Sequence, residues 1–204
     1  MDFLVFGATG RTGSAFVRQA LAGGHGVAAL ARSSGKGLPA GVAVTQGDVL
    51  DDDAVARAVR SEHTLVVTLG GVDSLTTGCD NVVRAAVATG ARRLLGVVGA
   101  GVLQANATHQ RHEMPDYPER FREIGGAHQA FHAAVKGSPL DWTLVCTPRI
   151  VDGPRTGAFV TRADYLPDGS GAVSTEDIAA LLLEEAIAPR FLRSRVGMNG
   201  GVAR

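Results

Sequence analysis

Cysteine is rare in this chain of 204 residues, which contains only Cys79 and Cys146, in no metal-like spacing. This scarcity excludes a disulfide-stapled scaffold and a cysteine-based zinc site, and it predicts a reduced, cytoplasmic protein. Long apolar runs are also missing, and none approaches the roughly 20 residues that cross a bilayer. The first apolar run begins at Phe3, so we expect neither an export signal nor a membrane partner.

The chain has no excess charge of either sign, because 20 lysines and arginines balance 20 aspartates and glutamates. This balance gives no reason to expect a nucleic-acid partner. The length suits one domain, since domains commonly hold about 100–200 residues. We therefore expect a single domain over residues 1–204 that binds small molecules, as a monomer or a homodimer.

What the chain does have is glycine, and three glycines follow the first apolar run. The strand expected over residues 3–6 leads into Gly7, Gly10 and Gly13, and a helix is expected over 14–22. The first glycine permits a tight turn, the second lets backbone N–H groups approach a pyrophosphate, and the third lets the helix pack closely. The positive end of the helix faces the same phosphates. The residues expected to hold the pyrophosphate are Gly7, Ala8, Thr9, Gly10, Arg11, Thr12 and Gly13.

Apolar runs alternate with helical patterns along the chain. Near-continuous apolar strands separated by helices indicate a parallel sheet covered on both faces. The sequence thus predicts an α/β fold, a doubly wound Rossmann-like domain with a mostly parallel sheet. Ser174, three residues before Asp177, is expected to open a late helix, and an edge strand is expected over 194–198. The other expected strands cover 27–31, 42–44, 65–69, 93–98 and 142–146.

The end of the second strand carries a base where an acidic residue would favour NAD. Arg32 and Ser33 stand there, with Lys36 close behind, and they suit the 2′-phosphate of NADPH. We therefore expect NADPH (NADP) rather than NADH; the alternative is that Arg32 only ends a strand at the surface. Asp48 and Val49 are placed to meet the adenine, although an aspartate in that loop could equally cap the next helix.

Several motifs together resemble one group of short-chain dehydrogenases. They are the turn 6–13, the strand end 31–32, and the segments 47–51, 148–157 and 173–178. With them the chain resembles the atypical short-chain dehydrogenase/reductase family that contains NADPH-dependent flavin reductase (biliverdin-IXβ reductase) and the NmrA-like proteins. The resemblance implies hydride transfer from NADPH to a flat, electron-poor acceptor such as a flavin, a quinone or a tetrapyrrole.

The resemblance also implies where cofactor and acceptor lie. The acceptor pocket would be built from the loops after the fourth, fifth and sixth strands, at about 70–78, 99–118 and 148–170. The ribose would be bordered by Leu69, Gly70 and Gly71, and the nicotinamide would be surrounded by Val98, Gly99, Pro148, Arg149 and Ile150.

Two positions depart from the family pattern. Gly99 stands where flavin reductase-like members carry serine, and Arg149 where they carry histidine. Gly99 offers no hydroxyl, and Arg149 cannot give up a proton in the working pH range. Arg149 could instead hold a carboxylate or phosphate of the acceptor, or form a salt bridge beside the cofactor.

The Tyr-x-x-x-Lys pair of the better-known short-chain enzymes is also absent. His132 and Lys136 stand at the matching helix, on one face. His132 could protonate an acceptor and Lys136 could bond the nicotinamide ribose, so with Arg149 they are the candidate catalytic residues. The alternative is that His132 packs under the loop and Lys136 is solvated. A catalytically silent, NAD(P)-sensing protein of the NmrA-like type is the second hypothesis. No metal is expected, because no cysteine joins the candidate ligands His109, His112, Glu113, His128 and His132.

Overall fold

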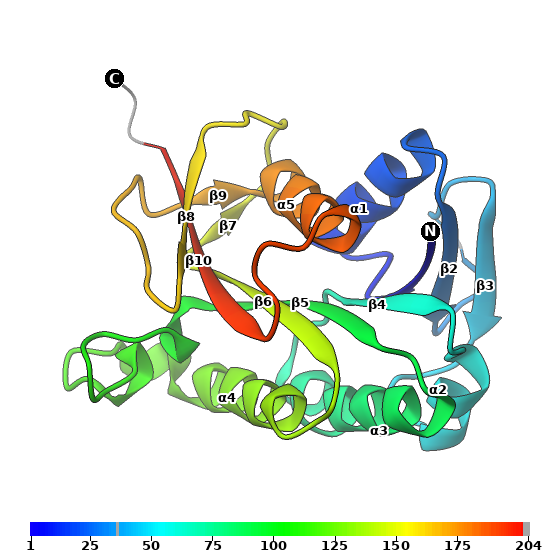
Figure 1. Ribbon diagram of the computed structural model, residues 1–204, viewed down its shortest axis with the longest axis horizontal. Coiled ribbons are helices and arrows are strands. Elements are labelled where there is room, and N and C mark those ends of the chain that lie inside the picture. The colour runs from blue at the N-terminus through cyan, green and yellow to red at the C-terminus, as the bar shows by residue number, and fades with distance from the viewer. Residues whose placement is uncertain (36, 202–204) are drawn as a thin grey trace.

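A computed structural model describes residues 1–35 and 37–201 of the chain, so Lys36 lies outside the described residues. The main sheet contains β1 (Asp2–Phe6), β2 (Gly26–Ala31), β3 (Val42–Gln46), β4 (His63–Val67), β5 (Arg93–Gly99), β6 (Asp141–Thr147), β8 (Phe159–Ala163) and β10 (Ser194–Gly200). Its strand order is β3-β2-β1-β4-β5-β6-β10-β8 (Figure 1). Every pair is parallel except β10 with β8.

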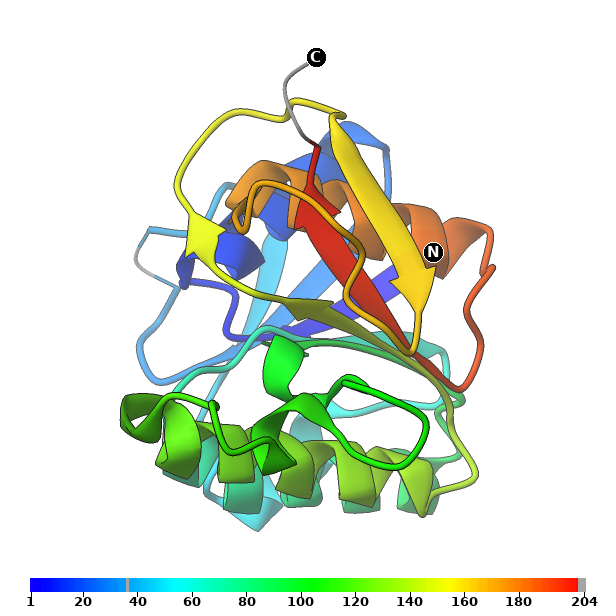
Figure 2. The same cartoon turned by 90° about the vertical axis from the view of Figure 1, so that its left-hand side faces the viewer.

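Helices cover both faces of this sheet. One face carries α1 (Arg11–Ala22) and α5 (Thr175–Ile187), and the other carries α2 (Asp52–Ala58), α3 (Cys79–Thr89) and α4 (Arg122–Lys136) (Figures 1 and 2). Short helical turns complete the chain: η1 (Ser74–Gly78), η2 (Ala100–Val102), η3 (Arg111–Glu113) and η4 (Glu119–Phe121). The doubly wound Rossmann-like fold predicted from the sequence is confirmed.

The helices begin and end where their terminal residues can satisfy the backbone. Asp51 caps α2, because its carboxylate accepts a hydrogen bond from the Ala54 N–H at 3.2 Å. Ser174 caps α5 by accepting from the Asp177 N–H at 3.0 Å. Gly90 ends α3 in the left-handed region, with φ of 80°. No helix within the described residues has the length and apolar character needed to span a bilayer.

Two apolar cores hold the three layers together, one on each face of the sheet. Phe16 of α1 and Ile178 of α5 pack with Val145 of β6 on one face. Phe131 of α4 and Leu75 of η1 pack on the other face, with Leu144 of β6. Neighbouring residues of β6 thus enter opposite cores, as the two-residue period of a strand requires. Both faces being covered explains the near-continuous apolar strands of the sequence.

The C-terminal third differs from the sequence expectation. The strand expected at an edge over 194–198 is β10, which lies between β6 and the antiparallel strand β8. β8 was not predicted because its residues are half-buried or exposed, so it lacks an apolar run. A second small sheet pairs β7 (Ile150–Val151) with β9 (Val173–Ser174). The helix after the glycine turn also begins earlier than expected, at Arg11.

Candidate functional site

The glycine turn after β1 is closed by the neighbouring strand. Gly7 has φ of 87°, and a β-carbon there would lie 2.7 Å from the Thr68 carbonyl oxygen, so only glycine fits. The Gly10 N–H donates to the Gly7 carbonyl at 2.9 Å. Thr68, just beyond β4, donates its hydroxyl to the Phe6 carbonyl at 3.1 Å. The turn is therefore fixed against the sheet on one side, and its other side faces solvent.

The helix that follows presents free N–H groups at this turn. Gly10 is its N-cap residue and provides no side-chain cap, and no acidic residue occupies the first turn. The first hydrogen bond of the helix runs from the Ser14 N–H to the Gly10 carbonyl, at 2.8 Å. The N–H groups of Arg11, Thr12 and Gly13 come before it and have no partner within the helix. An uncapped N-terminus of a twelve-residue helix attracts an anion through these donors and the helix dipole.

Two cavities meet at this turn and form one groove along the carboxyl ends of the strands. A cavity of about 350 Å³ reaches from the glycine turn toward the ends of β2 and β3. A second, of about 280 Å³, reaches toward the ends of β5 and β6. Both are lined by Thr68, Leu69 and Gly70. The sheet order reverses between β1 and β4, so the groove lies at the topological switch point where doubly wound folds bind ligands.

The first cavity has a cation at one end and an aspartate on its floor. Arg32 is exposed at the end of β2 and forms no ion pair with any described residue. Asp48 is half-buried, and one of its carboxylate oxygens accepts the Leu50 N–H at 3.0 Å. The helix cap that could have occupied Asp48 is supplied by Asp51 instead. The other Asp48 oxygen is therefore available to a ligand in the cavity.

The second cavity contains a histidine that contacts Gly99. The Gly99 N–H donates to Nδ1 of His128 at 3.3 Å, so the proton of the neutral ring is on Nε2. A β-carbon on Gly99 would lie 3.0 Å from that Nδ1, so the imidazole occupies the space that a larger residue would need. Burial lowers the pKa of His128 to about 4. The ring is therefore neutral at pH 7 and offers Nε2–H as a donor, not a labile proton.

The family model for NAD(P)H-binding proteins matches residues 7–189, which include the glycine turn and every helix of the sheet's two faces. The chain belongs to the NAD(P)H-binding family. A "putative exported protein" of Burkholderia pseudomallei is similar, with 28% sequence identity, 97% of this chain and 98% of that chain covered, and a TM-score of 0.86.

Two further solved structures share the fold. A "putative NADH-flavin reductase" of Streptococcus pneumoniae has 24% identity and a TM-score of 0.82, with 98% of this chain and 99% of that chain covered. An anaerobilin reductase of Escherichia coli O157:H7 has 23% identity and a TM-score of 0.85, with 100% of this chain and 99% of that chain covered.

The groove fits the cofactor of an NAD(P)H-binding protein. The glycine turn and the free N–H groups of α1 suit a pyrophosphate, because no β-carbon or carboxylate obstructs them. The structure places fifteen of the expected cofactor residues along the groove: Gly7, Ala8, Thr9, Gly10, Thr12, Arg32, Asp48, Val49, Leu69, Gly70, Gly71, Val98, Gly99, Pro148 and Ile150.

Three of the expected cofactor residues stand apart from the cavity walls. Gly13 lies behind the turn, where it lets α1 pack against Gly7. Ser33 is exposed beyond Arg32. Arg11 is exposed and its guanidinium lies 3.4 Å from the carboxylate of Asp152. An exposed pair of this kind contributes little to stability, so Arg11 can exchange Asp152 for a phosphate at small cost.

The expected catalytic residues do not meet in this groove. His132 and Lys136 line a separate cavity next to Trp142 of β6. Arg149 is exposed and forms no ion pair among the described residues, so the salt bridge considered for it is not seen. Within the described residues, no three histidine, cysteine or carboxylate side chains converge to hold a metal ion.

Thr68 and His128 are among the groove residues that the sequence reasoning missed. Thr68 follows β4, the neighbour of β1, so the expected strand order was the signal that could have placed it beside the glycine turn. His128 lies one turn before His132 on α4. Helical spacing showed that both histidines share a face, but it did not show which of them reaches the carboxyl end of the sheet.

Proposed function

We propose that this chain is an NADPH-dependent oxidoreductase that transfers a hydride to a flat, electron-poor acceptor such as a flavin, a quinone or a tetrapyrrole. The observation that carries the proposal is the continuous groove from Arg32, past the glycine turn, to His128. When bound there, NADPH would supply the hydride and its two electrons. The chain's own residues would bind and orient the two reactants.

Arg32 supports NADPH over NADH. Arg32 directly follows β2 and lines the first cavity, where the adenosine half of a dinucleotide lies in this fold. A 2′-phosphate could accept two parallel hydrogen bonds from it, whereas a 2′-hydroxyl would gain little from a cation.

His128 and Gly99 support a hydride-transfer site that uses few protein groups. Nε2–H of His128 could donate a hydrogen bond to an acceptor atom that gains negative charge, taking the part of the serine that this chain lacks. A pKa of about 4 prevents His128 from acting as an acid at neutral pH, so the proton for the reduced acceptor would come from water. Rate enhancement would come from holding donor and acceptor at near-attack distance.

The solved relatives support the acceptor class. The Streptococcus pneumoniae protein is named for flavin reduction, and the Escherichia coli protein for reduction of anaerobilin. We further propose that the chain acts as a monomer or homodimer, and that it acts in the cytoplasm because Cys79 and Cys146 are both free and buried. Such thiols gain nothing from an oxidising compartment.

The test is steady-state oxidation of NADPH at 340 nm with FMN, FAD, menadione and biliverdin as acceptors. We expect turnover on the order of 1 s⁻¹ with at least one of them, which lies at the low end of ordinary enzymes. His128→Leu should lower this kcat by roughly tenfold, the effect of one lost hydrogen bond, and leave NADPH affinity within about threefold. Tight NADPH binding without oxidation above the protein-free rate would reject the reductase and favour the NAD(P)-sensing protein.

Arg32→Glu should change cofactor preference. We expect the Kd for NADPH to rise by roughly 100-fold, because a charge-assisted pair is replaced by repulsion, while the Kd for NADH changes by less than about threefold. Arg57→Glu is the matched control, since it makes the same charge change at an exposed position of α2, outside the groove. Calorimetric titration of both variants with both cofactors measures this. Equal losses for NADPH and NADH in Arg32→Glu would refute the 2′-phosphate assignment.

A further inference from the structure

A separate cavity, of about 470 Å³, lies on the α4 face of the sheet, away from the groove. Its walls come from the C-terminal half of α4, the start of β6, the start of β10 and the segment between β5 and α4. None of its lining residues lines either cavity of the groove. On this face the segment between β5 and α4, drawn in green, lies beside α4 (Figure 2).

The walls of this cavity carry an excess of positive charge. Lys136, Arg193 and Arg195 contribute three cations, against the single carboxylate of Asp164. Arg195 already bonds to Asp164 Oδ1 at 2.9 Å and to the Val102 carbonyl at 2.6 Å. That leaves two cations on this wall without a carboxylate, and Lys136 has no ion pair with any described residue.

The guanidinium of Arg193 is held at the cavity by backbone carbonyls of the segment between α4 and β6. Its Nη2 donates to the Ser138 carbonyl at 3.2 Å, and its Nη1 lies 3.4 Å from the Leu140 carbonyl. The φ of Arg193 is 53°, and that of Asp164 is 59°. Within the described residues these are the two non-glycine positions with positive φ, and both line this cavity. Such strain costs about 1–3 kcal/mol per residue and clusters at ligand sites.

Buried polar atoms on the same walls lack partners. Nε1 of Trp142, Oε1 of Gln104 and Oε1 of Gln110 are all buried without a hydrogen bond among the described residues. Trp142 is 4% exposed and its ring meets that of His132 edge-on, with 5.7 Å between centroids. One unpartnered donor and two unpartnered acceptors, beside cations without a carboxylate, leave polar groups of both kinds available on this wall.

We propose that this cavity binds a small organic anion, whose carboxylate or phosphate group pairs with Lys136 and Arg193. Among the described residues no acceptor bonds the Nε–H of Arg193, and Lys136, the last residue of α4, lines the same cavity. His132 and Lys136, which the sequence suggested for hydride chemistry, belong to this anion site instead. The proposal does not depend on what binds in the groove.

The position of Trp142 makes the proposal directly measurable, because it is the only tryptophan of the chain. Its fluorescence should change saturably when sodium phosphate or sodium succinate is added, compared with sodium chloride at the same ionic strength. Phosphate alone acting would identify a phosphate site, and succinate alone a carboxylate site. A response to both anions that is no larger than the response to chloride would refute the proposal.

Variants separate this cavity from other anion sites. Lys136→Gln and Arg193→Gln should each raise the Kd obtained from the fluorescence titration by roughly tenfold, the effect of one lost charge-assisted hydrogen bond. Arg84→Gln is the matched control, because Arg84 is an exposed arginine of α3 whose ion pairs, with Asp52 and Asp80, lie at the surface. Arg32→Gln tests for phosphate in the groove and should leave the response unchanged. A saturable response that survives both Lys136→Gln and Arg193→Gln would overturn the proposal.

Discussion

Gly13→Ala is expected to destroy cofactor binding and to destabilise the fold, although it adds a single methyl group. A β-carbon on Gly13 would lie 2.1 Å from the Gly7 carbonyl oxygen and 2.6 Å from Thr68 Oγ1. The Gly7 carbonyl also accepts the Gly10 N–H, so it cannot move away without opening the turn. The start of α1 must shift instead, and its free N–H groups shift with it.

The size of this effect follows from the contact. Overpacking against a fixed backbone atom should lower the free energy of unfolding by about 3 kcal/mol. The Kd for NADPH should rise by roughly 100-fold or more, because displaced N–H groups lose charge-assisted hydrogen bonds to the pyrophosphate. Urea unfolding measures the first quantity and calorimetric titration the second.

Gly126→Ala is the matched control for Gly13→Ala. Gly126 is also a helical glycine, at an exposed position of α4, and a β-carbon there would meet nothing within 4 Å. Replacing it should stabilise the protein by about 1 kcal/mol, through helix propensity alone. Gly13→Ala receives the same propensity gain, so the difference between the two variants isolates the contact with Gly7. NADPH affinity within about threefold of wild type in Gly13→Ala would show that the turn does not position the helix.

The sequence predicted the nucleotide half of the molecule well because its signals are local. The glycine turn, the cap at Ser174 and the apolar strands each depend on neighbours within a few residues. The reversal of strand order at β1 follows from the fold class, so the place of the groove could be predicted before any side chain was positioned.

The histidine wall of the acceptor cavity could not be predicted, although Val98, Gly99, Pro148 and Ile150 were, because it depends on how segments distant in sequence are aligned. Whether His128 or His132 contacts Gly99 depends on the position of α4 along its own axis relative to β5, which no helical sequence pattern determines. β8 pairs with β10 across the chain and has no apolar run of its own. The cavity beside Trp142 depends on both the position of α4 and the pairing of β8 with β10, so no sequence motif predicts it.

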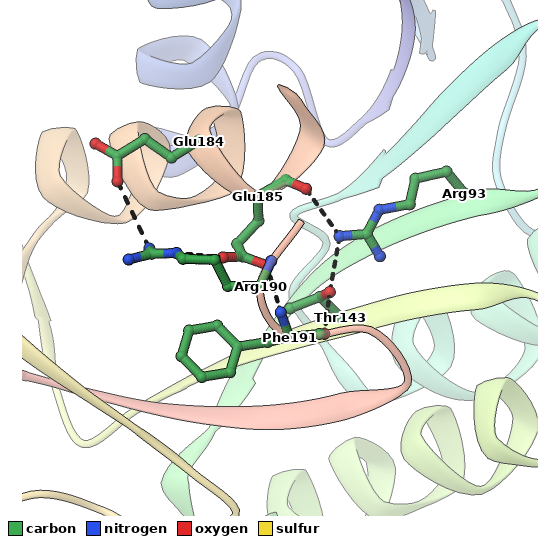
Figure 3. Close-up of polar contacts among 6 residues, drawn as sticks. All are labelled: Arg93, Thr143, Glu184, Glu185, Arg190 and Phe191. Carbon is green, nitrogen blue, oxygen red and sulfur yellow. Dashed lines mark hydrogen bonds and ion pairs between the residues drawn. The ribbon is translucent and has the colours of Figure 1, made fainter. Parts of the chain in front are cut away.

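The connection from α5 to β10 depends on one buried carboxylate, shown in Figure 3. Glu185 is fully buried, and its carboxylate accepts the N–H groups of Arg190 and Phe191, each at 3.1 Å, and Nε of Arg190 at 3.1 Å. Its backbone carbonyl accepts Nη2 of Arg93 at 3.0 Å, and that nitrogen also donates to Thr143 Oγ1 at 2.8 Å. Two strands and one helix end are thereby joined.

Glu185→Ala is therefore expected to cost about 3–5 kcal/mol of unfolding free energy, since it leaves two backbone donors and a guanidinium without their buried acceptor. For a chain of this length the midpoint of thermal unfolding should fall by roughly 10 °C. Glu184→Ala is the matched control: Glu184 is 47% exposed and pairs with Arg155 and Arg190 at the surface, so its loss should cost less than about 1 kcal/mol. Equal effects of the two substitutions would contradict the assignment.

Glu185→Ala also separates stability from binding. Its carboxylate lies among residues that line neither cavity of the groove, whereas α1, which carries the phosphate donors, contacts α5 near the other end, where Gln19 Nε2 donates to the Glu176 carbonyl at 3.0 Å. At 10 °C, where the variant should remain folded, the Kd for NADPH should stay within about threefold of wild type. Gly13→Ala should lose affinity at the same temperature. A cofactor site built from main-chain donors of α1 requires this contrast, because only a change at the helix start moves those donors.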